Sequence, residues 1–210
     1  NFDELNTNTV DLTSDSVDPV CLLNNAIVGL SFPSGTSIYY DEAIVQQIVT
    51  PNSGFVAGAN YNQDNRNNTG NQWDDYYTTV IKHTSDVIYQ LNAAESDRSN
   101  LLQMARILEA YAFMVLTDEY GEIPYFEAGK GLSEQVVLPK YDPQEQIYPD
   151  LITELTEARD ALSASAPAEN GEALYAGDLN QWRKLANSLL VRIGMRLSNV
   201  DATLAQQTVA

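Results

Sequence analysis

The fold is decided by residues 73–116, which read WDDYYTTVIKHTSDVIYQLNAAESDRSNLLQMARILEAYAFMVL. Within residues 73–91, apolar side chains recur at steps of three and four, and the same spacing returns within residues 101–116. This period places the apolar side chains on one face of an α-helix. A short polar stretch, residues 92–100, separates the two segments. We therefore expect two amphipathic helices of about 20 residues that pack as antiparallel neighbours.

Signals for helix starts mark the remaining elements on both sides of this pair. Three aspartates, Asp18, Asp142 and Asp178, each precede an apolar periodic segment, and the first two are followed by proline. An N-cap carboxylate with proline at the first helical position is a typical helix start. We expect helices over about 19–30, 37–49, 144–162 and 179–198, with Asp201 starting one more. Residues 51–72 have no apolar period and are predicted to form a long loop.

The fold class predicted from these elements is all-α. No segment alternates apolar and polar residues over the length of a strand, although residues 136–138 are a candidate for brief pairing. Helical hairpins that follow one another in sequence pack either as a bundle or as an α-solenoid. A clean 34-residue repeat is not visible, so the spacing alone does not identify tetratricopeptide repeats.

Charge excludes one large class of partners. The chain carries 29 Asp and Glu residues against 11 Lys and Arg residues, a formal net charge of −18. Binding to nucleic acid requires a basic surface that neutralises phosphates. We therefore predict no nucleic-acid partner. No stretch is long and apolar enough to span a membrane.

Residues for catalysis, metal binding or cofactor binding are sparse. The chain has one histidine, His83, and one cysteine, Cys21, which we expect to be a small core residue. Neither a zinc site nor a nucleophilic triad can be assembled from them, and no glycine-rich phosphate loop follows a strand. We predict no metal, no cofactor and no enzymatic activity. The acids Asp118, Glu119 and Glu122 cluster at a helix end, where we expect a solvated rim.

Aromatic and amide side chains are the features that point to a ligand. The chain holds 12 tyrosines and two tryptophans, and rings of this kind stack on the apolar faces of sugars. The candidate ligand-binding residues gather in one stretch: Tyr61, Asn62, Asn65, Arg66 and Trp73. By contrast, the helical spacing of Tyr76, Tyr77 and Trp182 predicts that these side chains pack in the core.

Five sequence blocks, spread in order over almost the whole chain, resemble the SusD/RagB family. The two most specific are Tyr120–Tyr125, which reads YGEIPY, and Pro139–Tyr148, which reads PKYDPQEQIY. The others are NFDELNTN at residues 1–8, WDDYY at residues 73–77, and a block from Gly177 through Trp182 to Leu197.

The resemblance implies a cell-surface, lipid-anchored outer-membrane protein of Bacteroidetes, built on tetratricopeptide-like helix pairs. Such a protein captures glycans or other nutrients and covers a SusC-type TonB-dependent transporter. We expect residues 1–210 to form a single helical SusD-like domain, about half of a longer protein. The cysteine that carries the lipid in this family is missing before residues 1–8, so a membrane contact would depend on an anchor that this chain lacks.

The sequence leaves alternatives to glycan capture. One is a helical-repeat adaptor that binds only proteins. Another is a glycoside hydrolase that uses two of the clustered acids near Glu122. The main hypothesis remains an oligosaccharide-binding protein without catalytic activity.

Overall fold

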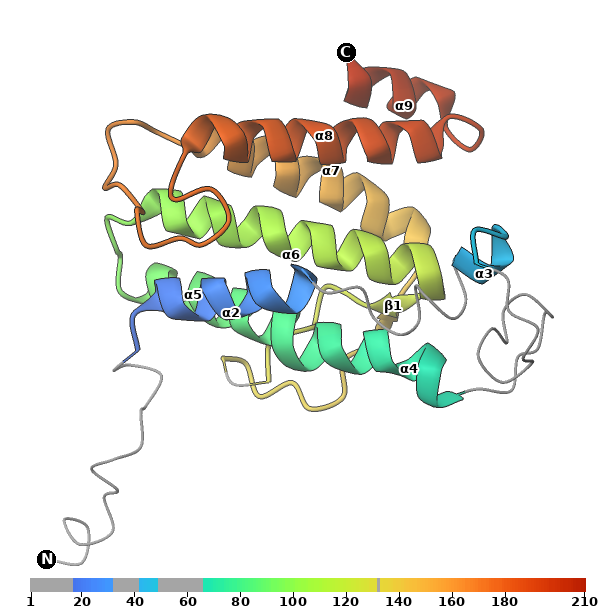
Figure 1. Ribbon diagram of the computed structural model, residues 1–210, viewed down its shortest axis with the longest axis horizontal. Helices are drawn as coiled ribbons and strands as arrows, with labels where there is room; N and C mark the ends of the chain where they lie inside the picture. Colours follow the sequence, from blue (N-terminus) through green and yellow to red (C-terminus); the bar gives the residue numbers. More distant parts are fainter. Residues whose placement is uncertain (1–16, 32–41, 49–65, 132) are drawn as a thin grey trace, which may run out of the picture.

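The computed structural model describes residues 17–31, 42–48, 66–131 and 133–210, and most of these are helical (Figure 1). The helices are α2 (Pro19–Ser31), α3 (Glu42–Ile44), α4 (Arg66–Asp75), the π-helix η4 (Tyr76–Ile81), α5 (Lys82–Ala93), α6 (Ser99–Tyr120), α7 (Gln144–Ala161), α8 (Leu179–Leu197) and α9 (Ala202–Val209). Two short strands, β1 (Ile123–Pro124) and β2 (Tyr141–Asp142), pair antiparallel. The predicted all-α class is confirmed.

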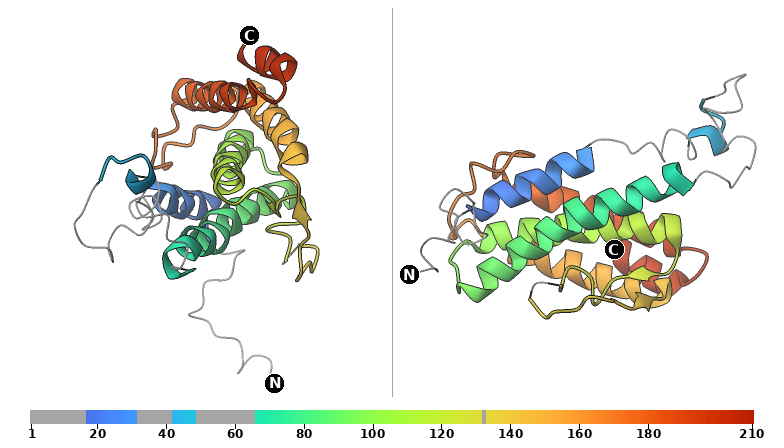
Figure 2. Two further views of the ribbon diagram at one scale, coloured as in Figure 1. Left: turned by 90° about the vertical axis from the view of Figure 1, so that its right-hand side faces the viewer. Right: turned by 90° about the horizontal axis from the view of Figure 1, so that it is seen from below.

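The long helices pack in chain order. α5 lies against α6, α6 against α7, α7 against α8, and α8 against α9, while α2 closes the other side of α5. An end-on view places α6 in the middle, with α2, α5, α7 and α8 around it (Figure 2). Consecutive antiparallel helices stacked in this way form an α-solenoid, so the structure decides between the two predicted arrangements.

The central position of α6 explains its composition. Its buried side chains include Leu101, Met104, Ile107 and Leu116, which point in different directions around the helix axis. A helix that is apolar on several sides is one that other helices surround. Trp182 of α8 is fully buried and Tyr76 nearly so, which confirms the predicted core positions of both rings.

The helix before residue 76 begins earlier than the sequence predicted. α4 already starts at Arg66, so residues 66–72 are helical and do not belong to the predicted loop. The sequence of α4 is mostly polar and has no apolar period, so the pattern did not indicate a helix. This segment is helical because it continues into the packed η4 and α5 segments. The predicted helix over 37–49 was also wrong in part: within residues 42–48 only Glu42–Ile44 is helical.

Cys21 is exposed on α2, so its predicted core position was wrong. The buried side chains of this helix are Leu23, Ala26 and Ile27. Two residues along an α-helix correspond to about 200° of rotation, so Cys21 points away from Leu23. The three consecutive apolar residues at 21–23 cannot share one face.

Asp142 does not cap α7, as the sequence had predicted. That helix has Pro143 at its N-cap position, without a side-chain cap. Asp142 lies in β2, and its Oδ2 accepts hydrogen bonds from the backbone N–H groups of Tyr125 (3.0 Å) and Phe126 (2.9 Å). The strand partner of β1 is therefore residues 141–142, and the candidate pairing at residues 136–138 was wrong. The predicted N-caps Asp178 and Asp201 are confirmed.

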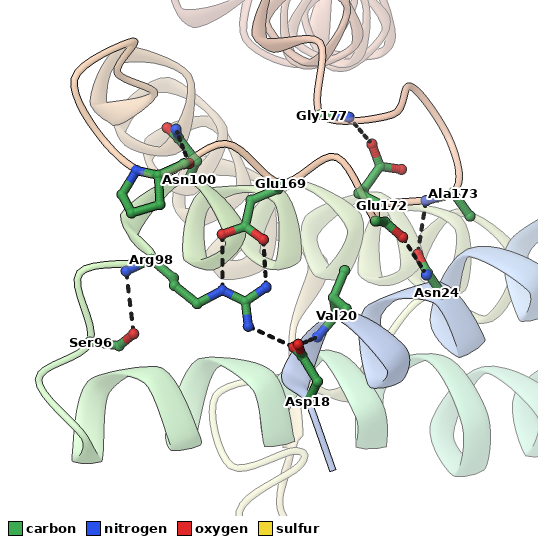
Figure 3. A network of polar contacts seen from close by, with 12 residues as sticks. Asp18, Val20, Asn24, Ser96, Arg98, Asn100, Glu169, Glu172, Ala173 and Gly177 are labelled. Atoms are coloured by element: carbon green, nitrogen blue, oxygen red, sulfur yellow. Dashed lines mark hydrogen bonds and ion pairs between the residues drawn. The ribbon is translucent and has the colours of Figure 1, made fainter.

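A polar network lies at the end of the stack where α5 connects to α6 and where α7 connects to α8 (Figure 3). Arg98, in the turn before α6, contacts both Glu169 (2.5 Å) and Asp18 (2.6 Å). Glu172 accepts from the indole Nε1 of Trp182 at 2.9 Å and from backbone N–H groups of its own loop. The residues that meet here come from three distant parts of the chain. We call Asp18, Arg98, Glu169, Glu172 and Trp182 the polar end.

Candidate functional site

Aromatic rings gather at the opposite end of the stack, around Trp73. The Trp73 ring lies 5.2 Å from Tyr120, edge to face, and 5.9 Å from Tyr141, with an interplanar angle of 20°. Tyr141 is 62% exposed, whereas Trp73 and Tyr120 are partly buried. We call Trp73, Tyr120 and Tyr141 the Trp73 surface. It joins α4, the last residue of α6 and β2, three segments far apart in the sequence.

A row of further rings supports this surface from below. Trp73 contacts Tyr77 at 4.8 Å, Tyr77 contacts Phe113 at 6.4 Å, and Phe113 contacts Tyr125 at 4.7 Å between ring centroids. Tilted and edge-to-face pairs at such distances are favourable beyond the burial of apolar area. The hydroxyl of Tyr77 also donates to the carbonyl oxygen of Pro124 at 2.7 Å. Burial raises the pKa of Tyr77, so this hydroxyl remains a donor at neutral pH.

The π-helix η4 sits directly after α4 and carries Tyr76 and Tyr77. A π-turn holds one more residue than an α-turn, and π-helical insertions are frequent at functional sites. The extra residue shifts the phase of the helix, so that α4 and α5 present different faces to their neighbours. Tyr76 and Val80 remain buried, while Trp73 reaches the edge of the core.

The β1–β2 pair fixes the position of Tyr141. Pro124 is the register partner of Tyr141, and Ile123 is that of Asp142. Because Asp142 also accepts the two N–H groups that follow β1, the segment before α7 is held against the end of α6. The ring of Tyr141 is thereby kept over Trp73, although most of it faces solvent.

Acidic groups lie around the end of α6. Gln72 donates to Glu119 at 2.7 Å, and Glu122 is exposed. Asp118 is engaged by Arg196 at 2.7 Å and by the hydroxyl of Tyr148. Burial raises the pKa of Asp118, although these two partners act in the opposite direction. The predicted solvated rim is thus confirmed for Glu119 and Glu122, which are both exposed, whereas Asp118 serves to connect α6 with α7 and α8.

Only one of the five predicted ligand-binding residues has a described side chain. Trp73 is central to the aromatic surface. Arg66 begins α4, which places its backbone on the same helix, and Tyr61, Asn62 and Asn65 lie outside the described residues. The ligand-binding role of all five residues stays a prediction.

Sequence reasoning missed Tyr120 and Tyr141 as members of the surface. Both belong to the two sequence blocks, YGEIPY and PKYDPQEQIY, that carry the family resemblance most specifically. The signal was present, because a ring in each block is followed closely by proline and by a second ring or a helix start. What spacing could not show was that the β1–β2 pair brings the two blocks together.

The described residues contain neither a membrane-spanning helix nor a cluster of metal-ligating side chains. No helix among them has the length and apolar character needed to cross a membrane. Within those same ranges, three or more His, Cys, Asp or Glu side chains do not come together as a metal site would require.

Comparison with known families identifies the chain. Residues 10–210 match the family SusD-like_2, described as starch-binding and associating with the outer membrane. The match covers nearly the whole chain, and the chain belongs to this SusD-like family. The resemblance noted in the sequence is therefore confirmed.

Solved structures agree with this assignment. A SusD-like protein of Bacteroidetes is 27% identical, with a TM-score of 0.79 over 92% of this chain. A chitin-binding protein is 28% identical, with a TM-score of 0.77 over 91% of this chain. A SusD homologue from Parabacteroides distasonis shares the fold, with a TM-score of 0.79 at 23% identity.

The chain is shorter than these structural relatives. It spans 36% of the SusD-like protein, 42% of the chitin-binding protein and 38% of the Parabacteroides distasonis homologue. No curated protein matches the chain in the sequence comparison. The expectation that residues 1–210 are about half of a longer protein stays a prediction.

Proposed function

We propose that this chain binds oligosaccharides at the cell surface and delivers them to a SusC-type TonB-dependent transporter in the outer membrane. The family description links its members to starch and to the outer membrane, and one similar structure is a chitin-binding protein. Attachment to the membrane through a lipid anchor is part of the proposal, since the family description associates its members with the outer membrane.

The observation that carries the proposal is the exposed ring of Tyr141 stacked on Trp73. An exposed tyrosine usually retains free rotation, but here the indole of Trp73 covers one side of the ring and restricts its orientation. A preoriented ring loses less entropy when a sugar stacks on it. Hydroxyl groups of the sugar would then meet polar groups at the rim, such as Glu122.

The other predicted binding residues lie next to Trp73 in the sequence. Tyr61, Asn62 and Asn65 precede α4 in the sequence, and Arg66 is its first residue; the last turn of the same helix contains Trp73. We propose that they add a second ring and hydrogen-bonding groups to the Trp73 surface. Amide and guanidinium groups suit sugar hydroxyls, because they offer donors and acceptors at fixed angles.

We also propose that the chain is a binding protein and has no catalytic activity. Hydrolysis of a glycosidic bond requires two carboxyl groups that face the same bond. Asp118 is engaged with Arg196 and Tyr148, and Glu119 accepts from Gln72. These contacts support structural roles for both acids.

Affinity electrophoresis and calorimetry against soluble starch, maltoheptaose and chitohexaose test the proposal. We expect binding to at least one glycan, and Trp73→Ala should weaken it about tenfold or more, as loss of a stacked aromatic side chain does. Trp182→Phe is the control, because Trp182 is buried at the polar end. Equal affinity of Trp73→Ala and the unaltered chain would remove Trp73 from the site.

A second candidate function is a protein adaptor without glycan binding. The observation in its favour is the segment before β2, where Val137 is 83% exposed and Leu138 is 89% exposed. Exposed apolar side chains in a loop are typical of protein interfaces. Co-purification with the transporter that is lost in Val137→Asp together with Leu138→Asp, in a chain that binds no glycan, would favour this function.

A further inference from the structure

A cavity of about 750 Å³ lies between α5, α6, α7 and the loop that follows β1. Figure 2 shows this loop beside α7, next to β1. The cavity walls combine aromatic rings, such as Phe126 and Tyr89, with the carboxyl groups of Glu109 and Asp150. Trp73, Tyr120 and Tyr141 are not among its lining residues, whereas Phe113 and Tyr125, which support the Trp73 surface from below, also line the cavity.

The loop that covers the cavity is seated closely on α5. Gly129 has a φ angle of +71°, and a Cβ atom at this position would lie 2.1 Å from the hydroxyl oxygen of Ser85. Only glycine permits both this backbone conformation and this approach. The same Ser85 hydroxyl donates to Oε1 of Glu109 at 2.5 Å, and Thr84 donates to that oxygen at 3.1 Å. Glu109 is thus held in one position from the α5 side.

The two basic residues of the lining already have acidic partners. Arg106 contacts Glu154 and Glu157, each at 2.8 Å, and Lys130 contacts Glu134 at 3.3 Å. Across the described ranges, neither Glu109 nor Asp150 has an ion-pair partner within 4.0 Å.

Among the described residues, these two carboxyl groups accept hydrogen bonds from hydroxyl groups and from no other donors. Asp150 accepts from the hydroxyl of Tyr125 at 2.7 Å, as Glu109 does from Ser85 and Thr84. Burial, with a smaller contribution from the charge of Glu154, raises the pKa of Glu109 to about 7, more than the two hydroxyl donors and the charge of Arg106 lower it. The charge of this carboxylate is therefore poorly compensated in the free protein. A cation in the cavity would supply the missing compensation.

We propose that this cavity binds a ligand with a protonated primary amine, for which Glu109 and Asp150 are the counter-ions and Phe126 and Tyr89 contact the apolar body. Aromatic rings combined with carboxylates are the surroundings in which ammonium groups bind in proteins. The volume is in the range of small-molecule sites, and it accommodates an amino sugar or a lysine side chain. This site is additional to the proposed capture of neutral glycans at the Trp73 surface.

Calorimetric titrations at pH 7 with two matched pairs of ligands test the proposal. The first pair is the glucosamine dimer and its N-acetylated counterpart; the second is Nα-acetyl-lysine amide and its Nε-acetylated form. We expect at least one free amine to bind more tightly than its neutral partner. Binding of the sugar amine alone would identify an amino-sugar site, and binding of the lysine amide alone a site for basic peptides. Failure of both amines, or equal binding of the neutral partners, would overturn the proposal.

Variants assign the binding to the two carboxyl groups. Glu109→Gln retains an oxygen that accepts from Ser85 and Thr84, and Asp150→Asn retains one for Tyr125. Each should weaken amine binding about tenfold or more, because a charge-assisted contact is lost. Glu145→Gln is the control, since it removes the same charge from an exposed position of α7 that does not line the cavity. Equal losses in all three variants would contradict the assignment.

A measurement on the unaltered chain does not depend on how the variants fold. In an NMR titration with the amine, the backbone amides of Ser85 and Gly129 should shift, whereas the indole N–H of Trp73 should not. Shifts confined to Trp73 would place the amine at the glycan surface and overturn the proposal. Because neutral glycans are expected to shift Trp73 and not Gly129, failure at either site can be recognised separately.

Discussion

The two tryptophans of the chain mark two ends of the helical stack with opposite properties. Trp182, in the first turn of α8, is fully buried and donates its indole N–H to Glu172. Trp73, in α4, is partly buried among rings, and the two helical turns lie at opposite ends of the stack (Figure 1). At the polar end, buried charges have partners from the chain itself. At the Trp73 surface, ring area remains available to a ligand.

This difference supports the proposal that the polar end maintains the fold and that the Trp73 surface binds the ligand. Glu169 is 3% exposed in its side chain, and Arg98 contacts both of its oxygens. A buried carboxylate with complete contacts has no capacity left for a ligand. The rings around Tyr141, by contrast, are apolar groups that can stay partly exposed to water in a stable protein, so they can also contact a ligand.

The largest expected effect comes from breaking the polar end. Arg98→Ala would leave Glu169 buried without a cation and should lower the free energy of unfolding by about 3 kcal/mol. Urea unfolding followed by circular dichroism measures this change. Glycan affinity of the folded fraction should stay the same, because Arg98 is far from Trp73 in the stack.

A matched control for that variant is Arg106→Ala. The acidic partners of Arg106 are 36% and 60% exposed, so water can replace the lost arginine. We expect a loss below about 1 kcal/mol from the ion pairs themselves. Equal losses for the two arginine variants would contradict the special role of the polar end.

Glu109 is a second carboxyl group inside the stack, but among the described residues it lacks the ion-pair partner that Glu169 has in Arg98. Its pKa is raised to about 7 by burial, above the ordinary 4.5. A raised pKa in the folded state contributes stability that is fully present below pH 4.5 and is lost as the pH rises through 7. The loss for this group is on the order of 3 kcal/mol.

The variant Glu109→Gln isolates this contribution. Subtracting its unfolding free energy from that of the unaltered chain cancels the other titrating groups. We expect the difference to fall between pH 4.5 and pH 8, in favour of the variant. A difference that is constant over this range, measured by urea unfolding, would show that Glu109 titrates normally in the folded protein.

A smaller effect is expected from the clamp that positions Tyr141. Asp142→Ala removes the acceptor for the N–H groups of Tyr125 and Phe126, which should cost about 1–2 kcal/mol of stability. Tyr141 would also lose its fixed orientation, so glycan affinity should fall a few-fold. If calorimetry shows lower stability with unchanged affinity, the clamp serves the fold and not the surface.

The sequence predicted the helices wherever an apolar period was present. Residues 73–116, Asp178 and Asp201 gave the correct helices and N-caps, because each depends on local spacing. Arg66 was placed in a loop because α4 has no apolar period of its own, and Cys21 was placed in the core although the consecutive apolar residues at 21–23 cannot all face it.

The candidate site was predictable only in part. Trp73 was identified from its place at the edge of an apolar helix. Tyr141 was not, because its contact with Trp73 results from the pairing of β1 with β2, and Asp142 gave a misleading helix-cap signal. Contacts between residues so far apart in sequence are set by tertiary packing, which local patterns do not encode.

The most direct test of the account is a ¹⁹F NMR titration of the chain labelled with 5-fluorotryptophan. The two tryptophans give two resonances, and Trp73→Phe assigns them without disturbing the polar end. With maltoheptaose or chitohexaose, whichever binds, we predict that the Trp73 resonance shifts while that of Trp182 stays in place. A ligand that shifts only the Trp182 resonance, or neither, would contradict glycan binding at the Trp73 surface.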